Sequence, residues 1–96
     1  MYLAKINQQL RKPIQMITNI NMGGYKSKVE YIVIHWVGAV GQAVQNGRYF
    51  KDVYRESSAE YFIDQNETVQ VVPENRVAWH VGDGLGKYGI RNDNAI

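Results

Sequence analysis

Tyr31-Ile32-Val33-Ile34-His35 is the stretch that decides the fold of this chain. Its consecutive large apolar residues predict a strand that is buried on both faces of a sheet. His35 follows where this strand leaves the sheet. In open α/β sheets, ligands bind at the carboxyl ends of the strands because helices cover the two faces. A histidine there can bind a metal or move protons, so we interpret His35 as a functional residue.

The length and composition of the chain limit its class. Ninety-six residues make one small domain with a modest core, and the contents of 45% hydrophobic and 21% charged residues are ordinary for a soluble globular chain. No apolar run approaches the ~20 residues that are needed to span a bilayer. The chain has no cysteine, which excludes a disulfide framework and thiolate zinc ligands within this stretch.

Charge and the N-terminus bear on partners and location. The net charge is +2, and the Lys and Arg residues are scattered rather than clustered with aromatics. We therefore expect neither nucleic acid nor a membrane as a partner. The N-terminus shows no apolar segment of a secretory signal. We expect synthesis in the cytoplasm, with action elsewhere depending on another route of release.

The first part of the chain is predicted to be an arm. A short helix is possible from Leu3 to Leu10, and Pro13 stops it. An extended segment follows over residues 14–17, and a turn-rich loop then leads to the strand that ends at His35. We predict that residues 1–28 form an N-terminal arm and that the main domain covers residues 29–96.

Hydrophobic periodicity predicts a helix and a hairpin in the main domain. Apolar residues from Val40 to Tyr54 follow helical spacing. Gly47 interrupts this helix at a cost of up to ~1 kcal/mol relative to Ala, so we expect a close neighbour there. Strands over residues 59–64 and 68–72 should pair across a tight turn. The fold class is therefore α/β, with a mixed sheet and flanking helices.

The glycine-rich loop Gly84-Leu85-Gly86-Lys87-Tyr88-Gly89 matches the dinucleotide-binding pattern G-x-G-x-x-G. That site also needs a helix directly after the loop and an acidic residue ~20 positions further on. Residues 91–94 do not continue as a convincing amphipathic helix, and the sequence stops before such an acid. We therefore reject a nucleotide site and expect the glycines to allow sharp turns or a close approach to a ligand.

His35 and His80 are the only imidazoles in the chain. A catalytic zinc usually has three protein ligands and one open position for water. A set of His35, His80 and a carboxylate from Glu60 or Asp83 is conceivable, although spacing does not select it. His80, next to Trp79 and before the glycine loop, could equally line a groove or cap a turn.

Two other catalytic arrangements receive less support. Ser57-Ser58 lacks the flanking glycines of a nucleophile elbow, and no acidic partner is recognisable. Glu60 and Asp64 stay open as a carboxylate pair of the glycosidase type, but their spacing is not specific.

From residue 24 onward, several short motifs occur in a fixed order and spacing. In chain order they are Gly24-Tyr25-Lys26, Tyr31 to Ala39, Ser58 to Asp64, Val71-Val72-Pro73, Val77 to His80, Gly82-Asp83-Gly84 and Tyr88-Gly89-Ile90. Together they resemble the zinc-dependent N-acetylmuramoyl-L-alanine amidases of phage endolysins and bacterial autolysins. That family shares its fold with peptidoglycan recognition proteins.

The resemblance implies a reaction and a site. Zn²⁺ would polarise the amide carbonyl between N-acetylmuramic acid and L-alanine of bacterial peptidoglycan and lower the pKa of its bound water. The first zinc ligand would be His35. Relatives commonly carry His or Asn at the position of Glu60, so this residue either lines the cleft near the metal or lies on the surface. The expected substrate-binding residues are Trp36, Glu60, Trp79, His80, Gly82 and Asp83.

The resemblance also implies that residues 29–96 are the N-terminal part of an amidase catalytic domain. The catalytic acid/base and the remaining zinc ligands are expected beyond Ile96, so the chain alone should neither bind zinc tightly nor be active. It should expose an apolar edge and self-associate. The resemblance also implies that the protein reaches the cell wall by release of the kind that phage lytic proteins use. Two alternatives are a non-catalytic peptidoglycan-binding module that uses the same groove, and an α/β interaction domain in which His35 is merely packed.

Overall fold

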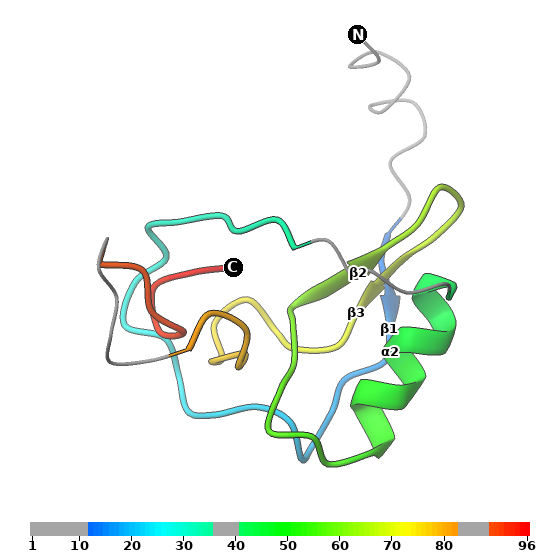
Figure 1. Ribbon diagram of the computed structural model, residues 1–96, viewed down its shortest axis with the longest axis horizontal. Helices are drawn as coiled ribbons and strands as arrows, with labels where there is room; N and C mark the ends of the chain where they lie inside the picture. The colour runs from blue at the N-terminus through cyan, green and yellow to red at the C-terminus, as the bar shows by residue number, and fades with distance from the viewer. Residues whose placement is uncertain (1–11, 36–40, 83–88) are drawn as a thin grey trace, which may run out of the picture.

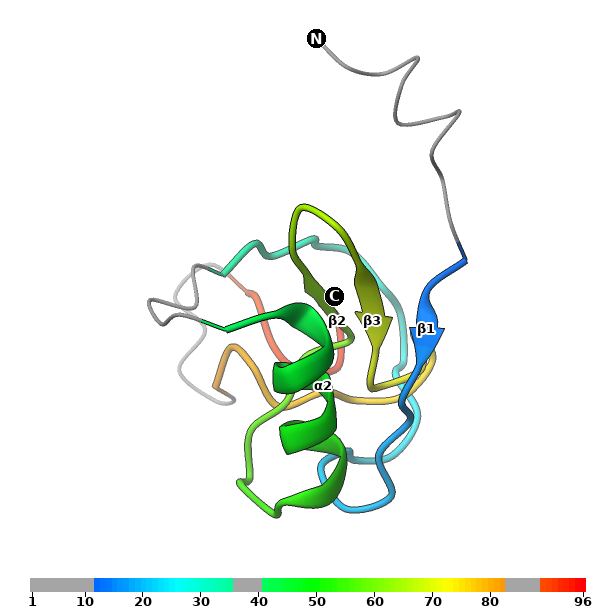
Figure 2. The same cartoon turned by 90° about the vertical axis from the view of Figure 1, so that its right-hand side faces the viewer.

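The structure is a computed structural model that describes residues 12–35, 41–82 and 89–96. Its sheet contains β1 (Ile14–Gln15), β3 (Thr68–Gln70) and β2 (Tyr61–Ile63) in that spatial order, with β3 parallel to β1 and antiparallel to β2. The helix α2 (Ala43–Asp52) packs against β2 and β3 (Figures 1 and 2). The expected α/β class with a mixed sheet is therefore confirmed, with one flanking helix in the described residues. No helix in these ranges has both the length and the apolar character to cross a membrane.

The early part of the chain is tied to the sheet and to the helix. β1 pairs with β3, and the predicted helix over residues 3–10 lies outside the described residues. The buried Asn21 side chain donates hydrogen bonds to the carbonyls of Phe50 and Val53, both at 2.6 Å, at the end of α2. Thr18 donates to the carbonyl of Lys51 at 3.0 Å. These side chains satisfy carbonyls that a helix end leaves without partners. The boundary at residue 28 stays a prediction.

Gly47 has the close neighbour that the sequence predicted, and this neighbour lies in β3. A Cβ atom added to Gly47 would lie 2.5 Å from Cγ1 of Val69, whose side chain is completely buried. This distance is shorter than any ordinary carbon contact, so glycine lets the helix approach β3 closely. The core around this contact consists of small side chains, which are Ala43, Val69, Val71, Val72 and Ala78.

We expect Gly47→Ala to destabilise the protein although alanine favours helices. The gain in helix propensity is about 1 kcal/mol, whereas overpacking a core costs about 1–3 kcal/mol. The net loss should reach up to about 2 kcal/mol in urea unfolding. Val69→Ala should cost less in the Gly47→Ala background than in the wild type, because it also removes the overpacked contact. Arg48→Ala on the exposed side of α2 should change stability by less than about 0.5 kcal/mol. An increase in stability for Gly47→Ala alone would contradict this packing.

Asp64 joins the β2–β3 hairpin to the start of α2. The hairpin pairs Phe62 with Val69, which confirms the predicted strands. One carboxylate oxygen of Asp64 accepts the backbone N–H of Ala43 at 2.8 Å, and the other accepts those of Asn66 and Glu67, both at 2.7 Å. These three hydrogen bonds hold the pKa of Asp64 below its ordinary value, with that from Ala43 contributing most.

This lowered pKa predicts a loss of stability in acid. A carboxyl with a lower pKa in the folded state stabilises the fold fully above its unfolded pKa, and that stability is lost as pH falls through the folded pKa. Below about pH 4 the melting temperature of the wild type should therefore fall more steeply than that of Asp64→Asn. Thermal melts at stepped pH measure this, with Asp52→Asn at the exposed end of α2 as a control that keeps the wild-type slope. Equal slopes for wild type and Asp64→Asn would exclude this role.

The segment that ends at His35 differs from its prediction. Its backbone forms hydrogen bonds to the C-terminal segment, from Val33 N to Ile96 O at 2.7 Å and from Ile96 N to Tyr31 O at 2.9 Å. However, the side chains of Ile32 and Ile34 are 80% and 93% exposed. The prediction of a strand buried on both faces is wrong for this structure, because no described element covers these side chains.

The exposed isoleucines support the expected self-association, which stays a prediction. Ile63, in the edge strand β2, is also 73% exposed, so apolar side chains are open to solvent both in this strand and in the segment before His35. We expect the apparent mass in size-exclusion chromatography with light scattering to rise with protein concentration. Ile34→Thr with Ile63→Thr should reduce this rise. A monomer at every concentration would contradict the expectation.

Candidate functional site

The two imidazoles of the chain meet. Nε2 of His35 lies 3.0 Å from Nδ1 of His80, and the rings are arranged edge to face with their centroids 5.2 Å apart. His35 is exposed at the end of its segment, whereas the side chain of His80 is buried. Asn92 holds His80 in place, since its Oδ1 accepts the backbone N–H groups of His80 at 3.0 Å and Val81 at 2.9 Å. The tertiary structure thus brings together the two histidines whose common site the sequence left as one open alternative.

Glu60 lies behind His80 and is not a surface residue. Its side chain is 2% exposed and forms an ion pair with Lys26, which is equally buried. The ammonium of Lys26 also donates to the carbonyls of Glu74 at 3.0 Å and Arg76 at 2.6 Å. The other carboxylate oxygen of Glu60 lies 3.7 Å from Nε2 of His80. The surface role that sequence analysis left open for Glu60 is therefore excluded.

The electrostatics of this cluster favour a neutral His80. Burial lowers the pKa of the His80 imidazole below its ordinary value, and the proximity of His35 and Lys26 lowers it further. The negative charge of Glu60 and the carbonyl of Ala95 oppose this shift but do not cancel it. A neutral imidazole can donate one hydrogen bond and accept another, so His80 can link two polar partners.

A cavity of about 470 Å³ opens beside the histidine pair. One end is polar and carries His35, Glu60 and His80. The rest of its wall is mainly apolar and comes from the segment before His35, from β2, from the start of α2 and from the C-terminus; it includes Ile32, Val33, Ile34, Ala43, Ala59, Phe62, Ile63 and Ile96. An apolar pocket with a few converging polar groups is the usual form of a small-molecule site.

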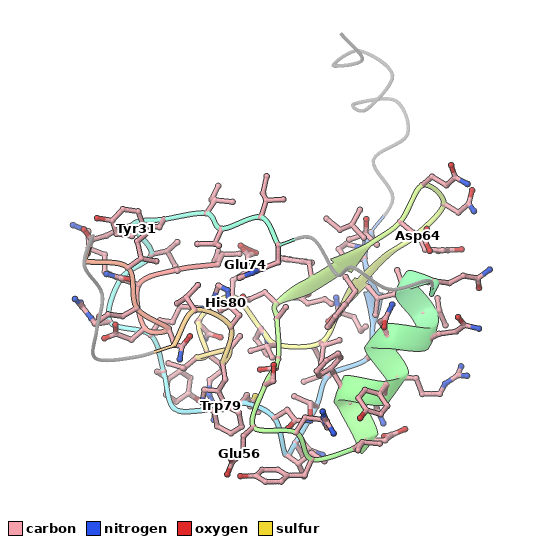
Figure 3. The ribbon with its side chains drawn as sticks, viewed as in Figure 1. Tyr31, Glu56, Asp64, Glu74, Trp79 and His80 are labelled. Carbon is pink, nitrogen blue, oxygen red and sulfur yellow. The ribbon has the colours of Figure 1, made fainter. Side chains whose placement is uncertain are left out.

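Trp79 and Gly82 line a different cavity from His80. This second cavity, of about 390 Å³, is bounded by Tyr54, Glu56, Trp79, Gly82 and Asn92. Figure 3 shows Trp79 beside Glu56 and away from His80, although the two residues are adjacent in the chain. The predicted substrate-binding residues are therefore divided between two cavities, and Trp36 and Asp83 lie outside the described residues. Their roles in binding stay predictions.

The other catalytic candidates have structural contacts. The buried Ser58 hydroxyl accepts the backbone N–H of Trp79 at 3.0 Å. Asp64 binds backbone N–H groups at the hairpin, and Figure 3 shows it well away from His80. Asp64 and Glu60 thus do not form a glycosidase pair.

Sequence reasoning assigned no role to Lys26 or Asn92. Lys26 belongs to a quoted motif but looks like any surface lysine, and Asn92 stands in a polar run. Nothing local shows that Lys26 will meet Glu60, 34 positions away, or that Asn92 will hold the backbone at His80. The sequence analysis instead placed Lys26 in the N-terminal arm and Asn92 in the main domain, so only the structure shows that both belong to one cluster.

Comparison with known proteins then decides the family. Residues 25–96 match the model of the N-acetylmuramoyl-L-alanine amidase family. The chain belongs to this family. No solved structure matches it significantly.

Three amidases that are similar to the chain come from Bacillus. The chain is 36% identical over 69 residues to the N-acetylmuramoyl-L-alanine amidase CwlA of Bacillus subtilis (strain 168), covering 72% of the chain and 25% of the relative. It is 37% identical over 85 residues to a probable N-acetylmuramoyl-L-alanine amidase of Bacillus licheniformis, covering 83% and 21%. CwlL of the same organism is 32% identical over 86 residues, with 83% and 21% covered. The chain thus spans a quarter or less of these relatives, and the match confirms the resemblance to the N-terminal portion of an amidase.

Proposed function

We propose that the chain supplies the N-terminal part of a zinc-dependent amidase that cleaves bacterial peptidoglycan between N-acetylmuramic acid and L-alanine. The observation that carries this proposal is the contact between His35 and His80 at the polar end of an apolar cavity, in a chain of the amidase family. The identity of the cleaved bond is taken from the names of the relatives, since each is called an N-acetylmuramoyl-L-alanine amidase.

The donor atoms fit part of a zinc site. His35 is exposed and carries an imidazole, which is a preferred zinc ligand. In residues 12–35, 41–82 and 89–96, no group of three His, Cys, Asp or Glu side chains is arranged to hold a metal. The carboxylate of Glu60 is already paired with Lys26. His35 would therefore be one ligand, and the others would come from outside these ranges.

Residues of this chain would bind and orient the substrate. The apolar wall of the cavity, with Ala43 and Phe62, would contact the methyl groups of the lactyl and alanyl units. His80 would hold the ring of His35 at the polar end of the same cavity. A bound zinc would supply a polarised carbonyl and an activated water.

The test combines metal content with bond cleavage. Purified peptidoglycan is incubated with the 96-residue chain and, in parallel, with the full product of the gene, and new L-alanine N-termini are counted. We expect the full product to contain zinc, to release L-alanine N-termini, and to lose this activity reversibly with a chelator. A metal-free product that releases none would overturn the proposal. If that product still binds peptidoglycan, the non-catalytic binding module is the correct function.

A further inference from the structure

We propose that the Lys26–Glu60 ion pair positions both imidazoles of the site. It holds His80 with its ring hydrogen on Nε2 and, through His80, holds His35 with its ring hydrogen on Nε2. His35 is then left with the free electron pair on Nδ1. Only the use of that nitrogen as a metal ligand rests on the proposed function.

The first step is that Lys26 keeps Glu60 in place. Both side chains are 2% exposed, so solvent screens neither charge. An ammonium group has three hydrogens, and that of Lys26 has three acceptors, which are Glu60, the carbonyl of Glu74 and the carbonyl of Arg76. Two of these acceptors are backbone atoms, so the position of the ammonium is set by the fold. Glu60 is therefore held with its second oxygen toward His80.

The second step concerns His80. Its Nε2 faces two acceptors, the carbonyl of Ala95 at 3.5 Å and the carboxylate of Glu60 at 3.7 Å. An electron pair on Nε2 would point at these oxygens and be repelled, whereas a hydrogen on Nε2 is attracted to both. Nε2 of a neutral His80 therefore carries the hydrogen, and Nδ1 is the acceptor.

In the third step, the tautomer of His80 determines the tautomer of His35. Nδ1 of His80 lies 3.0 Å from Nε2 of His35, which is the distance of an ordinary hydrogen bond. Because Nδ1 of His80 accepts, Nε2 of His35 must donate. A metal binds the ring nitrogen that has no hydrogen, and the hydrogen bond at the other nitrogen determines which one that is. His35 thus presents Nδ1, and Lys26 and Glu60 act on it through His80 as positioning residues.

Nuclear magnetic resonance of the imidazole nitrogens tests this directly in the metal-free 96-residue chain. With only two histidines, both rings can be assigned from long-range ¹⁵N–¹H spectra. At about pH 8 the wild type should show the Nε2-protonated tautomer for His35 and for His80. A ring hydrogen on Nδ1 of either residue, or an even mixture of tautomers, would overturn the proposal without any variant.

A variant isolates the carboxylate. Glu60→Gln keeps the shape of the side chain but can turn an amide N–H toward His80, so both rings should shift toward the Nδ1-protonated tautomer. Glu56→Gln is the control, because Glu56 lies at the other cavity and should leave both tautomers unchanged. Unchanged tautomers in a folded Glu60→Gln, judged by its amide spectrum, would refute the role of Glu60. This readout uses neither metal nor substrate, so it can fail while the amidase assay succeeds, and the reverse.

Discussion

Lys26→Met is expected to lower the free energy of unfolding by about 3–5 kcal/mol, because it leaves the buried carboxylate of Glu60 without its counter-charge. Methionine has a similar length, so the volume of the lysine stem stays filled. The charge of Glu60, in contrast, stays inside the protein, where desolvation is expensive. A loss of this size is a large fraction of the stability of a small domain.

A double variant distinguishes loss of the whole ion pair from loss of one of its two charges. Lys26→Met combined with Glu60→Leu removes both charges, and it should recover most of the stability that Lys26→Met loses. Lys51→Met, which breaks an exposed pair with Asp52, should cost less than about 1 kcal/mol. Urea unfolding of the four proteins measures these differences. If Lys26→Met costs no more than Lys51→Met, the ion pair is not buried in solution.

His35→Ala is expected to reduce amidase activity of the full gene product by more than about 100-fold. That factor is the upper range for losing a residue that only supports a metal ligand, and loss of the ligand itself should exceed it. Zinc content should fall in parallel. His35 is exposed and ends its segment, so its removal should leave the melting temperature nearly unchanged.

Lys28→Ala is the control for His35→Ala. Lys28 is an exposed residue of the segment that precedes His35, and its substitution should preserve activity, zinc content and stability. Full activity with zinc retained in His35→Ala would remove His35 from the metal site. Loss of activity accompanied by unfolding would assign His35 a packing role, as in the alternative of an α/β interaction domain.

Local patterns in the sequence determined the elements that depend on near neighbours. The helix around Gly47 and the hairpin of β2 and β3 follow from apolar spacing and turn residues within a few positions of one another. Gly47 in an otherwise helical pattern predicted a close contact, and Val69 provides it. The order of short motifs likewise indicated the amidase family, because order and spacing survive even where single residues vary.

Only the tertiary structure decided which side chains share a site and which are covered. His35 and His80 are separated by 45 positions and Lys26 and Glu60 by 34, and no local pattern connects residues so far apart. The apolar run before His35 looked like a buried strand, but burial depends on what packs against a strand rather than on its own residues. A pattern of apolar residues indicates that a segment favours an apolar neighbour. Which element becomes that neighbour, and whether one does, is decided by the folded chain.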